Sequence, residues 1–325
     1  MTSHDVVARI RRLAKTRRVG HGGTLDPMAT GVLIIGVNRA TRLLTYVIGS
    51  SKSYAATIRL GQSTITDDAE GDVTAVASVA GVTEEAIHAG LAAQRGEIDQ
   101  VPSAVSAIKV DGKRAYKRVR EGEAVALPPR RVTIARLDVL DIRRAVAGAV
   151  DVAGSVDVAG PVGGAGAVDV AGSVDVAGPV DVTGSVGVAR AVDVVDVDIE
   201  VDCSSGTYIR AIARDLGAAL GVGGHLTVLR RTAVGRMTLA EALTLDELEA
   251  RAPEVVGLSM ADAARQTFPQ RTATPDEARV LSHGGPLEPV GIAGPYAVFD
   301  PAGDVLAIVS EREGRARAEI VLAPA

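Results

Sequence analysis

The feature that most limits how this chain can fold is a thirteen-residue stretch near its start, residues 19–31, which contains four glycines and one proline. Glycine takes backbone angles that other residues avoid, and proline fixes its own angle and restricts the residue before it. We therefore expect neither a regular helix nor a strand here. Its single carboxylate, Asp26, is held on a stiff loop near Thr24 and His21, with little side-chain bulk to obstruct a large substrate. A tight Asp-Pro turn is the simpler interpretation, and a catalytic loop is the alternative.

The length and the cysteine content limit the class of protein. A chain of 325 residues can bury a sizeable core and has room for more than one domain. The single cysteine, Cys203, excludes an internal disulfide and a cysteine-only metal site, and it suits the reducing cytoplasm. We find neither a signal peptide nor a run of about 18 apolar residues, so we expect a cytoplasmic protein without a membrane span.

The charge is unevenly distributed along the chain. The net charge of −5 argues against an RNA-binding protein, but residues 151–200 alone carry −8 and the remainder carries +3. Residues 1–42 contain eight Arg or Lys and two Asp. This segment could neutralise phosphates, although a solvated helix face explains the same pattern.

Hydrophobic spacing predicts the first regular elements. Thr2 and Asp5 have the spacing of a helix-capping box, and apolar residues follow at helical intervals. Residues 53–60 alternate and predict a strand with Tyr54 on its inner face, where a core tyrosine is as good an interpretation as a functional one. Residues 66–72 are acidic, but their spacing matches no calcium loop, so we interpret them as a solvated turn.

The same patterns predict further elements: a helix at 83–94, strands at 105–110, 132–142 and 197–203, and a helix from near Ala211 to Gly221. Tyr208 and Arg210 can point the same way only on an extended segment, since on a helix they would diverge by about 200°. Cys203 could be a nucleophile, but a small buried hydrophobe is the commoner role at strand spacing. The basic residues 113–120 are either an RNA contact or an exposed helix.

Residues 151–192 consist of short repeats such as DVAGSV and DVAGPV. A hexapeptide β-helix is conceivable, but valine and alanine interrupted by glycine and proline bury too little apolar area to offset about 1–2 kcal/mol of backbone entropy per residue. We therefore interpret residues 145–196 as a low-complexity insertion, flexible or loosely extended, that replaces the tip of a hairpin.

A second unit is expected from Pro253 onward. Thr274-Pro275-Asp276-Glu277 predicts a capped helix start, and Gly284-Gly285 predicts its end. Residues 296–322 are typical of three short strands. We therefore divide the chain into domains at 1–252 and 253–325.

Common cofactor and nucleophile motifs are missing from the sequence. There is no Walker loop, the glycines near His21 fail the dinucleotide pattern, and no Gly-x-Ser-x-Gly elbow is present. The five histidines include no pair at metal-ligand spacing. We therefore expect any chemistry to proceed without a metal or a nucleotide cofactor.

The string V-G-H-G-G-T-L-D-P-M-A-T-G-V-L closely resembles the catalytic motif of the TruB-type tRNA pseudouridine synthases. Four further blocks agree in order: Lys52-Ser53-Tyr54, residues 101–109, residues 203–210 and Leu229-Arg230-Arg231. The likeness covers about residues 2–145 and 197–250, and more loosely the C-terminal part. This resemblance implies an α+β fold, with a mixed, largely antiparallel sheet flanked by helices and a small β-rich, PUA-like C-terminal domain. Other small β barrels share the C-terminal pattern.

The resemblance also implies a function, which is the isomerisation of the T-loop uridine of tRNA (position 55) to pseudouridine after base flipping. Asp26 is implied to be the catalytic carboxylate, which adds to C1′ or C6 or removes the 2′ proton. The implied substrate-binding residues are Arg210, which would pair with Asp26 and keep it ionised, Tyr54, which would stack on the uracil, Tyr208 and Leu229, which would line the pocket, and His21, which would fill the gap left by the base. The implied partner is the T-stem-loop, bound by a monomer.

Two alternatives stay open at this point. One is an RNA-binding or RNA-folding protein that keeps the fold without the chemistry, and the other is a guide-RNA-dependent enzyme that acts on ribosomal RNA. Members of the resembled family normally have a strand and a Lys-Pro dipeptide before the first helix. Both are missing here, and of the two explanations, a start codon assigned too late and a sheet that lacks this strand, we favour the first.

Overall fold

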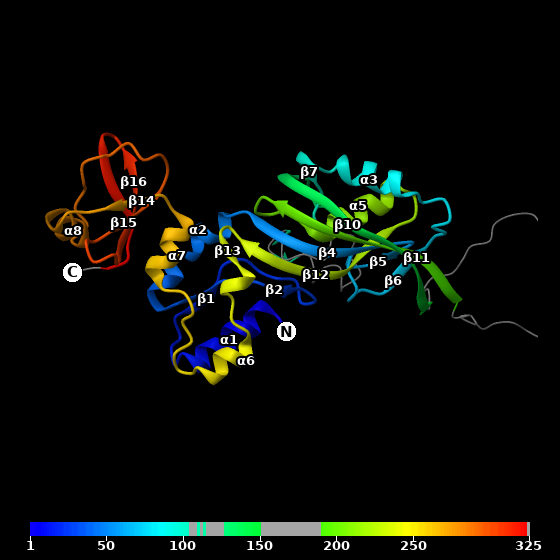
Figure 1. Ribbon diagram of the computed structural model, residues 1–325, viewed down its shortest axis with the longest axis horizontal. Helices are drawn as coiled ribbons and strands as arrows, with labels where there is room; N and C mark the ends of the chain where they lie inside the picture. Colours follow the sequence, from blue (N-terminus) through cyan, green and yellow to red (C-terminus); the bar gives the residue numbers. More distant parts are fainter. Residues whose placement is uncertain (104–108, 111–112, 115–126, 151–189, 324–325) are drawn as a thin grey trace, which may run out of the picture.

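The computed structural model describes residues 1–103, 109–110, 113–114, 127–150 and 190–323. Its centre is a seven-stranded sheet in the order β13-β12-β4-β11-β10-β7, with β2 paired to β12 off this path (Figure 1). Only the β2–β12 pair is parallel among these strands, so the predicted mixed, largely antiparallel sheet is confirmed. The strands are β2 (Thr30–Gly31), β4 (Lys52–Leu60), β7 (Gly96–Gln100), β10 (Arg130–Val150), β11 (Arg190–Cys203), β12 (Gly224–Val234) and β13 (Met237–Thr238).

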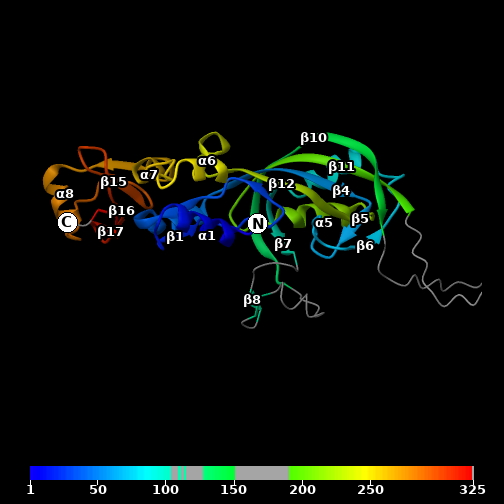
Figure 2. The ribbon, with the colours of Figure 1, turned by 90° about the horizontal axis from the view of Figure 1, so that it is seen from below.

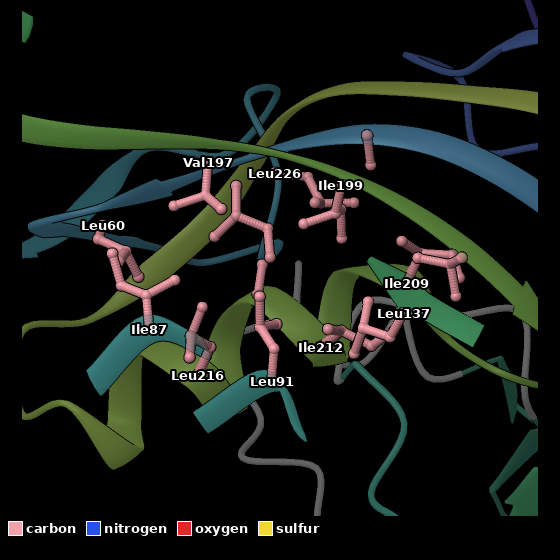
Figure 3. Packing of buried hydrophobic residues seen from close by; sticks show 14 of the residues in the cluster. Leu60, Ile87, Leu91, Leu137, Val197, Ile199, Ile209, Ile212, Leu216 and Leu226 are labelled. Carbon is pink, nitrogen blue, oxygen red and sulfur yellow. The ribbon is translucent and has the colours of Figure 1, made fainter. Parts of the chain in front are cut away.

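Two helices cover one face of this sheet, α3 (Glu84–Ala92) and α5 (Ile209–Ala219). Figure 3 shows sheet residues such as Leu226 facing Leu91 and Leu216 of the helices. Each of these side chains is fully buried and contributes about 1.5–3 kcal/mol by leaving water. The predicted inner faces of residues 53–60 and 197–203 are confirmed, and Cys203 is a buried free thiol within this core.

The N-terminal helix is confirmed as α1 (Ser3–Leu13), which Thr2 and Asp5 cap reciprocally. The expectation that residues 19–31 form no strand is wrong at both ends. β1 (Val19–His21) pairs with β3 (Ile35–Val37), and β2 lies against β12. In the β1–β3 pair two glycines face each other, Gly20 and Gly36. Glycine allows close packing there, since a Cβ on Gly20 would lie 3.2 Å from the Leu44 side chain.

The hairpin of β10 and β11 extends well beyond the predicted strands and is paired as far as Val150 and Arg190. The repeats at 151–189, the predicted strand residues 105–108 and the basic residues 115–120 lie outside the described residues. β8 (Lys109–Val110) and β9 (Lys113–Arg114) pair antiparallel, so the first two of the basic residues 113–120 are in a strand and not in a helix. Two more short strands, β5 (Gln62–Thr64) and β6 (Val73–Val76), form a separate pair.

A β-rich C-terminal domain is confirmed. Its sheet has the order β14-β15-β16-β17, and the capped helix predicted at Thr274 is present as α8 (Pro275–Ser282). One strand was not predicted, β14 (Gln270–Thr272), which pairs parallel to β15. The other strands are β15 (Tyr296–Phe299), β16 (Val305–Arg312) and β17 (Arg315–Val321). The domain boundary at residue 252 stays a prediction.

The C-terminal domain packs against the segment that follows the Asp26 loop. Leu43 and Tyr46, at the start of α2 (Leu44–Gly49), share a buried cluster with Phe268, Phe299 and Leu322. The Tyr46 hydroxyl donates to Glu319 at 2.6 Å. Figures 1 and 2 show the resulting elongated molecule, with the large sheet at one end, the C-terminal domain at the other, and α2 and α7 (Met260–Thr267) between them. The linker helix α6 (Leu245–Ala250) packs near α1.

Candidate active site

Asp26 lies on the irregular part of the glycine-rich stretch, residues 22–29, between β1 and β2. Ala29 N donates to Asp26 O at 2.9 Å and closes a turn around the carboxylate residue. The start of α1 holds the same loop, because Leu25 N donates to Ser3 Oγ at 2.9 Å. The Asp26 side chain is 34% exposed, so a substrate can reach a carboxylate that is anchored on both sides.

Arg210 holds this carboxylate. Its Nη2 donates to Asp26 Oδ1 at 3.1 Å, and its Nε lies 3.1 Å from Oδ2. Such a two-point contact fixes the plane of a carboxylate as well as its position. The Arg210 side chain is 6% exposed, so solvent screens the pair little on this side. The structure therefore brings together the two residues that the family resemblance pairs.

Asp68 is a third member of this cluster, and sequence reasoning missed it. Its Oδ2 lies 3.2 Å from Arg210 Nη1, and only 4% of its side chain is exposed. The prediction of a solvated turn at residues 66–72 is wrong for this residue. Leu226 of β12 bridges to Asp68 and donates to Asp67 O at 3.0 Å, so backbone contacts hold the turn alongside β12. An acidic run gives no local sign of such a contact.

The neighbouring Asp67 binds a different arginine. Its Oδ2 lies 3.5 Å from Arg214 Nη1, and its side chain is 15% exposed. Burial raises the pKa of Asp67, which opposes its ionisation. Within the described ranges no group of three or more His, Cys, Asp or Glu side chains is arranged to hold a metal ion.

Arg210 is on a helix and not on an extended segment, because α5 begins at Ile209 and not near Ala211. Tyr208 precedes it as the extended N-cap residue. Gln100 binds the backbone of Tyr208 at both groups, accepting from its N–H at 2.8 Å and donating to its carbonyl at 3.1 Å. This buried glutamine fixes Tyr208 as the extended residue before the helix. The prediction of a later helix start depended on Tyr208 and Arg210 both lying on an extended segment, and only Tyr208 does.

Tyr54 and Leu229 come from neighbouring strands of the sheet. Leu229 is buried in the main core, and Tyr54 packs against that core with part of its surface open. Burial raises the pKa of Tyr54 to about 12, while a hydrogen bond from Arg231 and its charge work in the opposite direction. The charge of Asp26 also acts on Tyr54, so the phenol belongs to the same electrostatic site.

His21, on β1, is half-buried and meets the ring of His4 edge-on, with 5.3 Å between the ring centroids. Burial lowers the pKa of His21, and the charge of His4 adds to this effect. Asp26 also lines a groove of about 760 Å³, which is otherwise formed mainly by apolar residues of α1, β3, α2 and residues 237–263. None of Tyr54, Tyr208 and Arg210 lines this groove, so it extends away from the Asp26–Arg210 pair.

Three parts of the chain match domains of known protein families, all of them from pseudouridine synthases. Residues 11–158 match the TruB family pseudouridylate synthase N-terminal domain. Residues 210–255 match the tRNA pseudouridylate synthase B C-terminal domain, and residues 268–323 match the tRNA pseudouridine synthase II C-terminal domain. None of the helices in the described part of the chain has the length and apolar character needed to span a membrane.

Two curated relatives are similar over almost the whole length. Both are named tRNA pseudouridine synthase B and are 50% identical to this chain. The protein from Arthrobacter sp. (strain FB24) matches over 99% of this chain and the protein from Mycobacterium sp. (strain KMS) over 100%, and each match covers 93% of the relative.

Solved structures share the fold at low identity. An H/ACA RNP bound to a substrate RNA containing 2′-deoxyuridine matches with a TM-score of 0.62 and 20% identity, over 100% of this chain and 82% of the other. The archaeal box H/ACA sRNP Nop10-Cbf5 complex matches with a TM-score of 0.61 and 22% identity, over 100% of this chain and 83% of the other. With its relatives at 50% identity and this fold, the chain belongs to the TruB family of pseudouridine synthases, which are isomerases.

Proposed function

We propose that this protein isomerises uridine to pseudouridine in the T-loop of tRNA, with Asp26 as the catalytic carboxylate. The observation that carries the proposal is the two-point contact between Arg210 and Asp26. The arginine is buried and its carboxylate partner is partly exposed, which is the arrangement expected of a carboxylate that is held in place and presented to a substrate. The relatives named tRNA pseudouridine synthase B support tRNA as the substrate.

The reaction is balanced without an added reagent. The bond from C1′ to N1 breaks, the detached uracil turns, and a new bond forms from C1′ to C5. C5 loses its proton and N1 gains one, so that uridine and pseudouridine contain the same atoms. No oxidant, reductant or group donor is required, which agrees with the expectation of an enzyme that uses no metal or nucleotide cofactor.

In this proposal each side chain has one task. Asp26 acts at the junction of sugar and base, and Arg210 orients it while Asp68 holds Arg210 from behind. Tyr54 stacks on the extruded uracil and, with its raised pKa, keeps its proton at neutral pH. Tyr208 and Leu229 line the base pocket, and His21 fills the gap in the RNA.

Recognition of the tRNA T-stem-loop relies on base flipping, which costs a few kcal/mol in a duplex and less where bases are already unstacked. We propose that phosphate contacts from the basic N-terminal segment offset this cost. We further propose that residues 253–325 form the C-terminal RNA-binding domain of a monomeric enzyme. The relatives at 50% identity favour a stand-alone tRNA enzyme over a guide-RNA-dependent one, because the H/ACA structures are only 20–22% identical.

The test compares wild type with Asp26→Asn on an unmodified tRNA transcript, with pseudouridine mapped by chemical labelling. We expect the variant to lose turnover while its affinity for the transcript stays within about threefold, since the removed charge acts on the reaction and not on RNA binding. Loss of binding together with activity would make Asp26 a structural residue. A wild-type protein that binds the transcript but forms no pseudouridine would point to the RNA-binding alternative.

A further inference from the structure

Arg231, in the second half of β12, heads the large side chains that are fully buried in the described part of the chain, with 1% of the residue exposed. Two of its N–H groups bind the glycine-rich stretch that carries Asp26, and a third binds the residue directly after it. Nε donates to Val32 O at 2.8 Å, Nη1 to Thr24 O at 3.3 Å and Nη2 to Gly23 O at 3.3 Å. One guanidinium therefore joins the two ends of the Asp26 loop.

The backbone of Arg231 holds the same loop. Val32 N donates to Arg231 O at 2.8 Å, and Gly31 is its register partner in the parallel β2–β12 pair. Gly31 has a φ of +95°, and a Cβ there would lie 2.1 Å from Arg231 O. Only glycine fits such a close approach. The loop thus ends directly on Arg231, and the side chain of that residue reaches back to where the loop begins.

The partners of Arg231 are unusual for a buried cation. Among the residues that the structure describes, no carboxylate forms an ion pair with it, and the three oxygens that accept hydrogen bonds from it on the loop side are backbone carbonyls. A buried charge without a counter-ion is costly. On β4 its register partner is Tyr54, so the two residues lie directly opposite each other on neighbouring strands, and the charge of Arg231 acts on the phenol. The arginine therefore touches the loop of the catalytic carboxylate and the tyrosine assigned to the base platform.

We propose that Arg231 is a positioning residue, whose guanidinium sets the spacing between the Asp26 loop and Tyr54. The expected effect of Arg231 on the reaction rests on the proposed function, whereas its effect on the position of the loop does not. Arg231 stands behind the loop and contacts carbonyls and Tyr54, so it acts through Asp26 and Tyr54.

The experiment uses Arg231→Met, which keeps the bulk and removes the donors, and Arg231→Lys, which keeps the charge but cannot reach three carbonyls together. Arg95→Met is the control, because Arg95 also donates to a backbone carbonyl, Leu137 O at 3.0 Å, which belongs to β10 and not to the Asp26 loop. Three quantities are measured for each variant: deuterium uptake of the peptide covering residues 22–31, affinity for a tRNA transcript, and the single-turnover rate of pseudouridine formation.

For Arg231→Met we expect faster exchange in the loop peptide and a rate lower by about a hundredfold, since a displacement of about 1 Å has that effect. The affinity for the transcript should stay within about threefold. Arg231→Lys should lose about tenfold in rate, and it decides the question if the methionine variant does not fold. Arg95→Met should match wild type in deuterium uptake, affinity and rate.

Unchanged exchange in both Arg231 variants, or rates within about threefold of wild type, would overturn the proposal. So would a loss of affinity as large as the loss of rate. A wild-type protein that forms no pseudouridine would instead refute the proposed function. In that case the comparison of deuterium uptake still decides whether Arg231 holds the loop.

Discussion

Replacing Asp68 by asparagine tests whether the arginine at the site depends on its second carboxylate. Removing one partner of a buried ion pair costs about 3–5 kcal/mol when the remaining charge is left without compensation. Arg210 keeps Asp26, and the asparagine oxygen can still accept from Glu70 N, as Asp68 Oδ1 does at 3.0 Å. We therefore expect a loss of about 2–3 kcal/mol in the free energy of unfolding, seen as a melting temperature lower by about 4–8 °C.

The matched control is Asp67→Asn, one residue earlier on the same turn. Asp67 pairs with Arg214 at 3.5 Å and not with Arg210, and burial already favours its neutral form by raising its pKa. We expect it to lose less than about 1 kcal/mol. Asp68→Asn should also slow pseudouridine formation by about 10–100-fold through a misplaced Arg210, with transcript binding retained. Equal melting temperatures for wild type and Asp68→Asn, or equal losses in both variants, would refute this reasoning.

Three further predictions follow from the fold. Joining Val150 to Arg190, which are register partners, through an Asn-Gly turn should leave pseudouridine formation intact and the melting temperature within about 2 °C; a folded but inactive product would contradict this. Burial raises the pKa of Tyr54 from 10.0 to about 12, so the folded state holds the phenol proton more tightly than the unfolded chain. The contribution of Tyr54 to stability should therefore be complete below pH 10 and fall by about 2–3 kcal/mol as the pH rises from 10 to 12. Burial also raises the pKa of Cys203, to about 11, so urea titrations of Tyr54→Phe should show a decrease that is smaller than that of wild type by this amount, and an equal decrease in both proteins would contradict the prediction. Leu43→Ala removes a buried side chain that packs with the C-terminal domain and should lower the free energy of unfolding by about 2–4 kcal/mol. Calorimetry that shows an unchanged melting temperature for the C-terminal domain would count against a shared core.

Much of the fold could be predicted because its signals are local. The cap formed by Thr2 and Asp5 and the alternation of residues 53–60 each depend on side chains a few positions apart, and both predictions are confirmed. The pairing of Asp26 with Arg210 was accessible only through the family resemblance, since 184 positions separate them. Spacing along the chain carries no information about such a contact.

The errors have the same origin. Asp68 is buried and not solvated because its backbone bridges to Leu226, which is on β12, more than 150 residues further along the sequence. The start of α5 is decided by Gln100, which binds the Tyr208 backbone from the end of β7. Arg231 looks like one more basic residue beside the exposed Arg230, and only the closed loop around it shows that it is buried. In each case a distant segment overrides the local preference.

The junction at α2 has a consequence for building hybrid enzymes. Leu43 and Tyr46 complete the apolar cluster of the C-terminal domain, and Arg39 and Arg42 donate to the carbonyls of Leu322 and Val321 at 3.1 and 2.8 Å. A chimera that exchanges only residues after 252 would place foreign side chains against this segment. A workable graft must therefore carry residues 39–46 along with the C-terminal domain, although the two are more than 200 positions apart in the gene product.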